Sequence, residues 1–257
     1  MSSSNSPFFS IILSIHNEAN EVIEDSINSI LNQTYKNFEF ILVVDNPKMP
    51  ISFLKKIKER DTRLKIVVNK KNIGLTHSLI KAIKITKGQY IVRQDADDIS
   101  LRERLSIAYD FIQKNNSVNF YSTPYIIDNK KRPKYLTRKI ITSHSLRYKN
   151  YLAHGTLIIN SEILKKINYD KKFKYSQDFD LYNRLLDEGY VLSYDQKNIT
   201  YKLGQNSNRI SSKHVIEQTF FRDLVIKRNG YQFINIRIVR LLRLDIYLDL
   251  YNYIFKR

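Results

Sequence analysis

Buried strands and amphipathic helices alternate along the first 115 residues of the chain. β-branched and aromatic residues form nearly uninterrupted apolar runs, typical of strands buried on both faces, at residues 8–15, 38–44, 64–68 and 89–92. Apolar residues recur at helical spacing between and after these runs, at residues 21–32, 51–60, 75–86 and 101–115. Because short loops join these segments, the pattern predicts an α/β fold with a Rossmann-like, mostly parallel sheet flanked by helices.

The order of elements is less regular after residue 115. A turn is expected at residues 128–130, and short strands are expected at residues 118–127, 134–141, 156–159, 191–194 and 199–203. One helix is expected at residues 161–167, capped by Ser161, and another begins at residue 177 and stops at Gly189. We therefore expect a mixed sheet in this half and a helical extension over residues 206–257.

Polar residues follow each of the four predicted parallel strands. In chain order they are His16-Asn17-Glu18, Asp45-Asn46, Asn72 with Gly74, and residues 95–98. The carboxyl ends of parallel strands meet at one edge of a sheet, and ligands of α/β proteins bind outside that edge. The sequence therefore predicts that these four loops converge on one ligand site.

Three carboxylates lie within four residues of one another in the last of these loops, at Asp95, Asp97 and Asp98. Such carboxylates repel one another unless they face water or a cation. Oxygen ligands suit Mg²⁺ or Mn²⁺, and such an ion can bridge two phosphates and neutralise charge on a departing diphosphate. Arg93 is expected on the same side of its strand as Asp95, placed either to contact phosphate or to pair with the carboxylates. A solvated, helix-capping turn is the simpler interpretation, and the convergence of four loops argues against it.

Glycine-rich phosphate-binding motifs are absent from the sequence, which has six glycines. Neither the Gly-x-x-x-x-Gly-Lys loop nor the Gly-x-Gly-x-x-Gly turn occurs, which argues against an NTPase and a dinucleotide enzyme. Carboxylates such as Glu18 and Asp45 can accept hydrogen bonds from a base and a ribose, but they do not identify the nucleotide.

The chain carries a formal net charge of +18, which predicts anionic partners. The absence of cysteine excludes disulfides and thiolate chemistry. We find no signal-peptide pattern and no apolar run long enough to span a membrane, so a cytoplasmic location is expected. Residues 234–255 are apolar but carry Arg237, Arg240 and Arg243, which predicts either a helix on the inner, anionic membrane surface or a helix packed on protein.

Several stretches together resemble the family-2 glycosyltransferases, which are inverting enzymes with the A-type nucleotide-sugar fold. The stretches are residues 10–18 with 26–35, 38–45, 72–75 with Ala82, 90–104, and 177–181. They occur in the family's order and cover residues 8 to about 205. The resemblance implies a donor-binding half at residues 8–100 and an acceptor half at 101–205.

The resemblance also implies roles for particular residues. Glu18, Asp45 and Asn72 are expected at the nucleoside. Asp95 is expected at the ribose or the metal, with Arg93 beside it, and Asp97 as a ligand of Mn²⁺ or Mg²⁺. His154 is expected near the diphosphate or the transferred sugar, and Asp178 is expected to deprotonate the acceptor hydroxyl. The implied reaction moves one sugar from a nucleoside-diphosphate sugar, which we expect to be a UDP-sugar, to a glycan or lipid-linked acceptor of a cell-surface polysaccharide.

The sequence departs from the family pattern where Asn46-Pro47 follows Asp45 and where Gln177 replaces a glutamate. The absence of tryptophan removes the signature of polymerising relatives, so a single addition is expected. Two other classes stay open. A sugar-nucleotide nucleotidyltransferase would normally carry a glycine-rich basic loop after its first strand, and residues 16–19 are not such a loop. A nucleic-acid-binding protein would explain the charge, but no binding motif for it is present, and no nucleic acid is expected as a partner.

Overall fold

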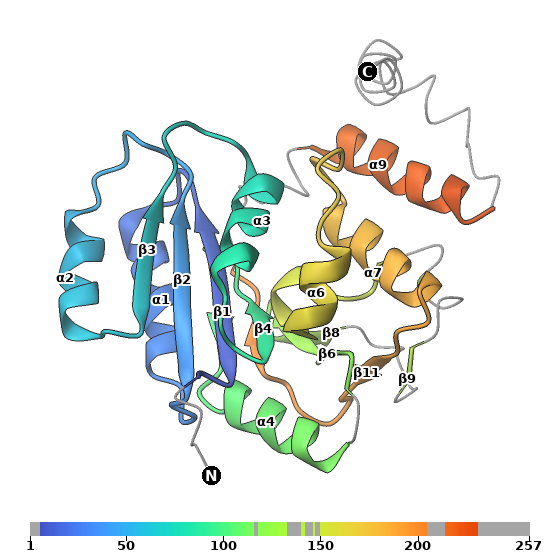
Figure 1. Ribbon diagram of the computed structural model, residues 1–257, viewed down its shortest axis with the longest axis horizontal. Helices are drawn as coiled ribbons and strands as arrows, with labels where there is room; N and C mark the ends of the chain where they lie inside the picture. Colours follow the sequence, from blue (N-terminus) through green and yellow to red (C-terminus); the bar gives the residue numbers. More distant parts are fainter. Residues whose placement is uncertain are drawn as a thin grey trace.

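The structure is a computed structural model, and it describes residues 6–115, 118–132, 140–141, 146, 150–204 and 214–230. Its framework is an eight-stranded mixed sheet with helices on both faces (Figure 1). The strands lie in the order β3-β2-β1-β4-β10-β6-β11-β9. The prediction of an α/β sheet flanked by helices is confirmed.

The first half of the sheet is parallel. It consists of β1 (Phe9–Ile15), β2 (Phe38–Val44), β3 (Leu64–Val68) and β4 (Tyr90–Arg93). Phe9 of β1 lies opposite Phe38 of β2 and Tyr90 of β4 in parallel register. All four strands therefore end at the same edge, as expected from their alternation with helices.

The second half of the sheet is mixed. β10 (Ile158–Asn160) runs antiparallel between β4 and β6 (Phe120–Ser122), β11 (Leu192–Tyr194) pairs with β6 in parallel, and β9 (Ile140–Ile141) closes that end. A second sheet has four short strands, β5 (Ile99–Ser100), β12 (Tyr201–Lys202), β7 (Tyr125–Ile127) and β8 (Lys130–Arg132). β5 directly follows the acidic loop, so this small sheet lies beside that loop.

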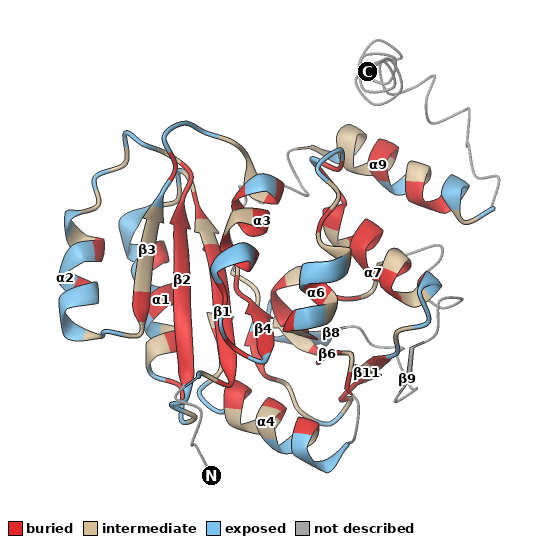
Figure 2. Cartoon of the chain, in the orientation of Figure 1, coloured by how far each residue is buried: buried red, intermediate tan, exposed pale blue. Residues whose placement is uncertain are grey.

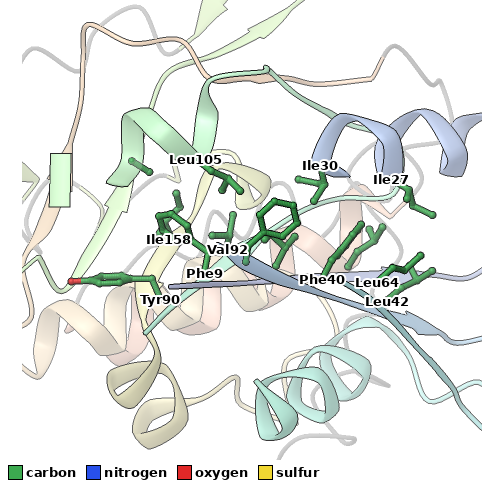
Figure 3. Close-up of a cluster of buried hydrophobic side chains, with 14 of the residues drawn as sticks. Phe9, Ile27, Ile30, Phe40, Leu42, Leu64, Tyr90, Val92, Leu105 and Ile158 are labelled. Carbon is green, nitrogen blue, oxygen red and sulfur yellow. The ribbon is translucent and has the colours of Figure 1, made fainter. Parts of the chain in front are cut away.

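Helices cover the large sheet because successive side chains of a strand point to opposite faces. The first face packs on α1 (Asn20–Leu31), α2 (Ser52–Arg60) and α4 (Arg104–Lys114). Phe9, Ile27, Phe40 and Leu105 belong to this core cluster, which Figure 3 shows. Apolar residues of α3 (Leu75–Ile85), α6 (Ser161–Ile167) and α7 (Gln177–Asp187) belong to the cluster on the opposite face. β1 and β2 are buried along almost their whole length (Figure 2).

Two expectations about local structure are wrong. The apolar run 118–127 is not one strand, because the chain leaves the large sheet after Ser122 and enters the small sheet at Tyr125, with Pro124 in between. Proline lacks the N–H that a central strand donates, which explains a break at this point. The cap of α6 is Asn160 rather than Ser161, because the Asn160 side chain accepts from the amides of Glu162 and Ile163.

The helix α9 (Val215–Arg228) packs against α7 (Figure 1). Its residues Phe220, Phe221 and Val225 form a separate apolar cluster with Phe173 and Phe179. No helix among the described residues is both long and apolar enough to cross a membrane. The predicted membrane-surface segment at residues 234–255 lies outside the described residues.

Candidate active site

Three loops at the carboxyl edge of the parallel strands are joined by hydrogen bonds. The His16 ring lies 3.2 Å from the carbonyl oxygen of Asp45 through Nδ1, and 3.2 Å from the amide nitrogen of Asn72 through Nε2. The Asn46 amide donates to Asn17 Oδ1 at 2.8 Å. The loops after β1, β2 and β3 therefore converge, as the topology requires.

Asp45 holds the loop that follows β3. Its carboxylate is buried and accepts from the Asn69 side chain at 2.8 Å and from the backbone amides of Ile73 at 2.9 Å and Gly74 at 2.7 Å. Gly74 has a φ of +81°, which favours glycine, and this conformation brings its amide to Asp45. Glu18 accepts from the amide of His16 at 2.7 Å, so it likewise shapes its own loop.

The acidic loop after β4 is held from two sides. On one side, Ser26 of α1 donates to the carbonyl of Asp95 at 2.8 Å. On the other side, the amide of Asp95 donates to the Tyr201 hydroxyl at 3.1 Å, and the amide of Gly204 donates to Asp98 Oδ1 at 2.8 Å. Both of the latter contacts come from β12 or the residues directly after it. The fourth loop is therefore fixed between the large sheet and the small one.

The buried side chain of Arg104 also supports the region around the acidic loop. Its guanidinium donates to the carbonyls of Arg93 at 3.0 Å and Gly155 at 2.6 Å, and to Ser100 Oγ at 2.8 Å. It also lies 4.7 Å from the centre of the Tyr201 ring. Burial lowers the pKa of Arg104 to about 10, so the group stays charged at neutral pH. Arg104 thus connects β4, the acidic loop and the segment around His154.

The carboxylates of the acidic loop differ in their surroundings. Asp95 accepts from Arg93 at 2.5 Å, which is the structural pairing allowed for by the sequence. Asp98 is buried, and burial together with the charges of Asp95 and Asp97 raises its pKa to about 8. Asp95 and Asp97 remain half-buried. Their mutual repulsion and oxygen chemistry fit a hard cation that a ligand also coordinates, whereas no three His, Asp or Glu side chains in the described residues form a complete metal site.

Asp178 lies in the first turn of α7. Its carboxylate accepts from the Asn150 side chain at 2.6 Å. Burial is the largest effect on this group, and it raises the pKa of Asp178 to about 6, although backbone amides and Asn150 oppose the shift. The charge of Asp95 raises the same pKa, which places Asp178 within electrostatic reach of the acidic loop.

Asp180 is two residues further along α7 but has a different environment. Its buried carboxylate accepts from Arg184 at 2.8 Å and from Arg228 of α9 at 2.6 Å. Two guanidinium groups therefore neutralise Asp180 and tie α7 to α9. The two aspartates do not share an environment, as expected for residues two apart at the start of a helix.

His154 begins a short 3-10 turn, His154–Thr156, directly before β10. Its Nε2 lies 2.6 Å from the hydroxyl of Tyr169. Burial, followed by the nearby charge of Arg93, lowers the pKa of His154 to about 3, so the ring is neutral at physiological pH. The charges of Arg93, Asp178 and Asp95 all act on the Tyr169 hydroxyl. Tyr169 therefore contacts His154 and lies near enough to Asp95 and Asp178 for their charges to act on its hydroxyl.

Sequence reasoning missed Arg104, Asn150 and Tyr169. The sequence did contain one indication of Arg104. It lies four residues before Ala108 on the buried side of α4, where an arginine is unexpected. Asn150 and Tyr169 carried none, because their contacts join segments that are far apart in the sequence.

A mixed sheet with a carboxylate loop at the carboxyl edge of its parallel strands is the arrangement expected of an A-type glycosyltransferase. The chain matches the model of glycosyl transferase family 2 over residues 10–191. It is 32% identical over 217 residues to an uncharacterized glycosyltransferase of Methanocaldococcus jannaschii, covering 80% of this chain and 74% of that protein. It is 30% identical to the O-antigen biosynthesis glycosyltransferase WbnJ of Escherichia coli, covering 88% of this chain and 92% of WbnJ. The chain therefore belongs to glycosyl transferase family 2, and it is a glycosyltransferase.

Solved structures confirm the fold. TarS of S. aureus (residues 1–349) with UDP-GlcNAc superposes with a TM-score of 0.70 at 17% identity, over 95% of this chain and 72% of that one. The mannosyltransferase PcManGT of Pyrobaculum calidifontis, with GDP-Man and Mn²⁺, superposes with a TM-score of 0.69 at 17% identity, over 97% and 70% of the two chains. The chain spans 43% of a longer TarS structure.

Proposed function

We propose that the protein transfers a single sugar, with inversion, from a nucleoside-diphosphate sugar to a hydroxyl group of a glycan or lipid-linked acceptor. The observation that carries this proposal is the placement of Asp178. Its carboxylate has a raised pKa of about 6, accepts a hydrogen bond from the Asn150 amide, and has no cationic hydrogen-bond partner among the described residues, while the charge of Asp95 acts on it. A carboxylate with these properties suits a general base, because it is ionised at neutral pH and still has appreciable affinity for a proton.

In this proposal Asp178 takes the proton from the acceptor hydroxyl as that oxygen attacks the anomeric carbon, and the bond from that carbon to the diphosphate oxygen breaks so that the nucleoside diphosphate leaves. Asp97 and Asp95 are the residues that would hold Mn²⁺ or Mg²⁺, which when bound stabilises the charge of the leaving diphosphate. Arg93 fixes Asp95 and places a buried positive charge beside the same position. His154 lies in the same cluster and contributes a neutral ring rather than a second base.

The nucleoside is assigned to the loops after β1, β2 and β3. Asp45 Oδ1 already accepts two hydrogen bonds from the protein, whereas Asp45 Oδ2 and Glu18 Oε2 accept one each. Each of these two latter oxygens can therefore accept a further bond from a base or ribose. Asn72 lies on the same edge through its contact with His16. The division into a donor half at residues 8–100 and an acceptor half at 101–205, followed by an extension at 206–257, is part of the proposal.

Relatives support a UDP-sugar donor and a lipid-linked acceptor. WfgD of Escherichia coli, 27% identical over 208 residues and covering 79% of each chain, is a UDP-Glc:alpha-D-GlcNAc-diphosphoundecaprenol beta-1,3-glucosyltransferase. WbnJ acts in O-antigen biosynthesis. PcManGT was solved with GDP-Man, so a guanine nucleotide is the competing choice.

A donor screen tests this proposal. UDP- and GDP-sugars are incubated with the protein and Mn²⁺, and thermal stabilisation and slow donor hydrolysis are measured. We expect one UDP-sugar to raise the melting temperature and to be hydrolysed only in the presence of the cation. Stabilisation by a GDP-sugar alone would reassign the nucleotide. A lack of response to any nucleoside diphosphate, together with salt-dependent binding of random DNA, contradicts the proposed function.

We also propose that the protein works in the cytoplasm, on the inner face of the membrane. Two observations support this proposal: the formal net charge of +18 on the chain, and the lipid-linked acceptor in the name of WfgD. Flotation with anionic liposomes, for the full chain and for a chain ending at residue 233, tests this idea. Equal flotation of the two chains contradicts a membrane role for residues 234–255.

A further inference from the structure

The contact between His154 and Tyr169 contains information about where the imidazole proton lies. The two atoms, Nε2 and the hydroxyl oxygen, are 2.6 Å apart, and the rings meet edge to face at 69° with centroids 5.6 Å apart. A neutral imidazole has one donor and one acceptor nitrogen, and the partner of one nitrogen decides the state of the other. The question is therefore which group donates in this contact.

Tyr169 is held firmly in place for this contact. It follows Asn168, whose φ of +53° turns the chain at the end of α6, and its amide donates to Asn168 Oδ1 at 2.8 Å. Arg184 of α7 donates to the carbonyls of Ile167 and Asn168, at 3.0 and 2.8 Å. On the other side, Arg104 holds the carbonyl of Gly155, next to His154.

The Tyr169 hydroxyl is the better donor of the two groups. It is buried, and within the described residues its one hydrogen bond is the contact with His154 Nε2. If Nε2 donated instead, the hydroxyl proton would be left without an acceptor there, which costs about 1–3 kcal/mol for a buried group. Burial also raises the pKa of Tyr169 well above the usual range, so the hydroxyl keeps its proton.

We infer that Tyr169 is a positioning residue that donates to His154 Nε2 and thereby fixes the imidazole as its Nδ1–H tautomer. His154 as a whole residue is intermediate in exposure, while burial of its ring is the largest cause of its lowered pKa. The ring then carries an uncharged Nδ1–H donor, and the charges of Arg93 and Asp95 are near enough to act on it. Its ligand is an oxygen that accepts without transferring a proton, such as an oxygen of the donor diphosphate or a sugar hydroxyl, an assignment that rests on the proposed function.

The tautomer can be measured without any substrate. The protein is labelled with ¹⁵N-histidine, and long-range ¹H–¹⁵N spectra show which ring nitrogen of each of its five histidines carries the proton. The His154→Asn variant assigns the resonances. We expect the proton on Nδ1 in the wild type. Once His154→Asn has assigned the resonances, a proton on Nε2 in the wild type overturns the inference, whether or not the sugar-transfer function holds.

A pair of variants tests the role of Tyr169. Tyr169→Phe removes the proposed donor, whereas Tyr182→Phe removes another buried hydroxyl that has no hydrogen-bond partner in the described structure. We expect Tyr169→Phe to lose the pure Nδ1–H signal and to lower the rate of sugar transfer by roughly tenfold, the size expected for one lost hydrogen bond. Tyr182→Phe is expected to keep the wild-type spectrum. An unchanged His154 spectrum in Tyr169→Phe contradicts the inference.

Discussion

The Nη1 atom of Arg228 lies 2.6 Å from Oδ1 of Asp180, across the contact between α9 and α7. Arg184 holds the other carboxylate oxygen at 2.8 Å. The Asp180 side chain is fully buried. Its charge therefore serves to join the two helices, while Asp178, in the same first turn, has an amide as its partner.

This ion pair predicts a stability difference between two arginines of α9. Arg228→Gln leaves buried Asp180 with one guanidinium, and we expect a loss of about 2 kcal/mol in the free energy of unfolding, typical of a lost hydrogen bond to a charged group. Arg222→Gln is the matched control, because Arg222 pairs with Asp223 near the surface, and a change within about 0.5 kcal/mol is expected. Urea unfolding measures both. Equal losses in the two variants would show that the Asp180 contact does not stabilise the fold.

Arg104 predicts a second difference of this kind. The guanidinium of Arg104 makes four hydrogen bonds, and a lysine ammonium has only three donors and no planar fork to span them. We therefore expect Arg104→Lys to lower the free energy of unfolding by about 2–4 kcal/mol. Arg102→Lys, at an exposed position two residues earlier, is expected to leave the free energy of unfolding unchanged. Thermal and urea unfolding of the two variants provide the comparison. An unchanged free energy of unfolding in Arg104→Lys contradicts the supporting role that we assign to Arg104.

The fall in the rate of sugar transfer at acidic pH, the acid limb of the pH–rate profile, should follow the protonation of Asp178. Its folded-state pKa is raised to about 6, so the ionised base is depleted as pH falls through 6, and the rate falls with it. Asn150→Ala removes a hydrogen bond that favours the charged form, so the limb should move to higher pH. The rate of transfer at saturating donor is measured from pH 4.5 to 8.5. A limb that stays in place in Asn150→Ala means that another group controls it.

Donor binding should depend on a divalent cation at Asp97. We expect Asp97→Asn to abolish turnover and to remove the effect of Mn²⁺ on donor affinity, with an unchanged melting temperature. Asp110→Asn, at an exposed position of α4, is the control and should behave as the wild type. Titration calorimetry with and without excess chelator gives the affinities. Full activity in the chelator contradicts the metal assignment.

The donor half of the fold could be predicted from sequence because its signals are local. Each strand of the parallel half is a continuous apolar run, and the predicted limits of β2 and β3 agree with the structure. The second half could not be predicted as well, since short strands of two or three residues are fixed by their neighbours rather than by periodicity. The split of residues 118–127 between two sheets is such a case, and Pro124 was its local signal.

In the candidate site, too, some features could be predicted from the sequence and others could not. Topology alone placed the loops of Asp45, Asn72 and Asp95 at one edge. The partners that decide their chemistry are tertiary, as with Asn150 beside Asp178 and Arg228 beside Asp180. Aspartates two residues apart at the start of a helix point in different directions, but this spacing does not say whether Asp178 or Asp180 is neutralised.

The most direct test compares sugar transfer by Asp178→Asn and Asp180→Asn under conditions where both variants are folded. Asp178→Asn should lose about 10²–10⁴-fold in kcat, the usual effect of removing a general base, while its calorimetric affinity for the donor and Mn²⁺ stays the same. Asp180→Asn should unfold at a lower urea concentration and keep most of its turnover. An active Asp178→Asn beside a folded but inactive Asp180→Asn would contradict the account.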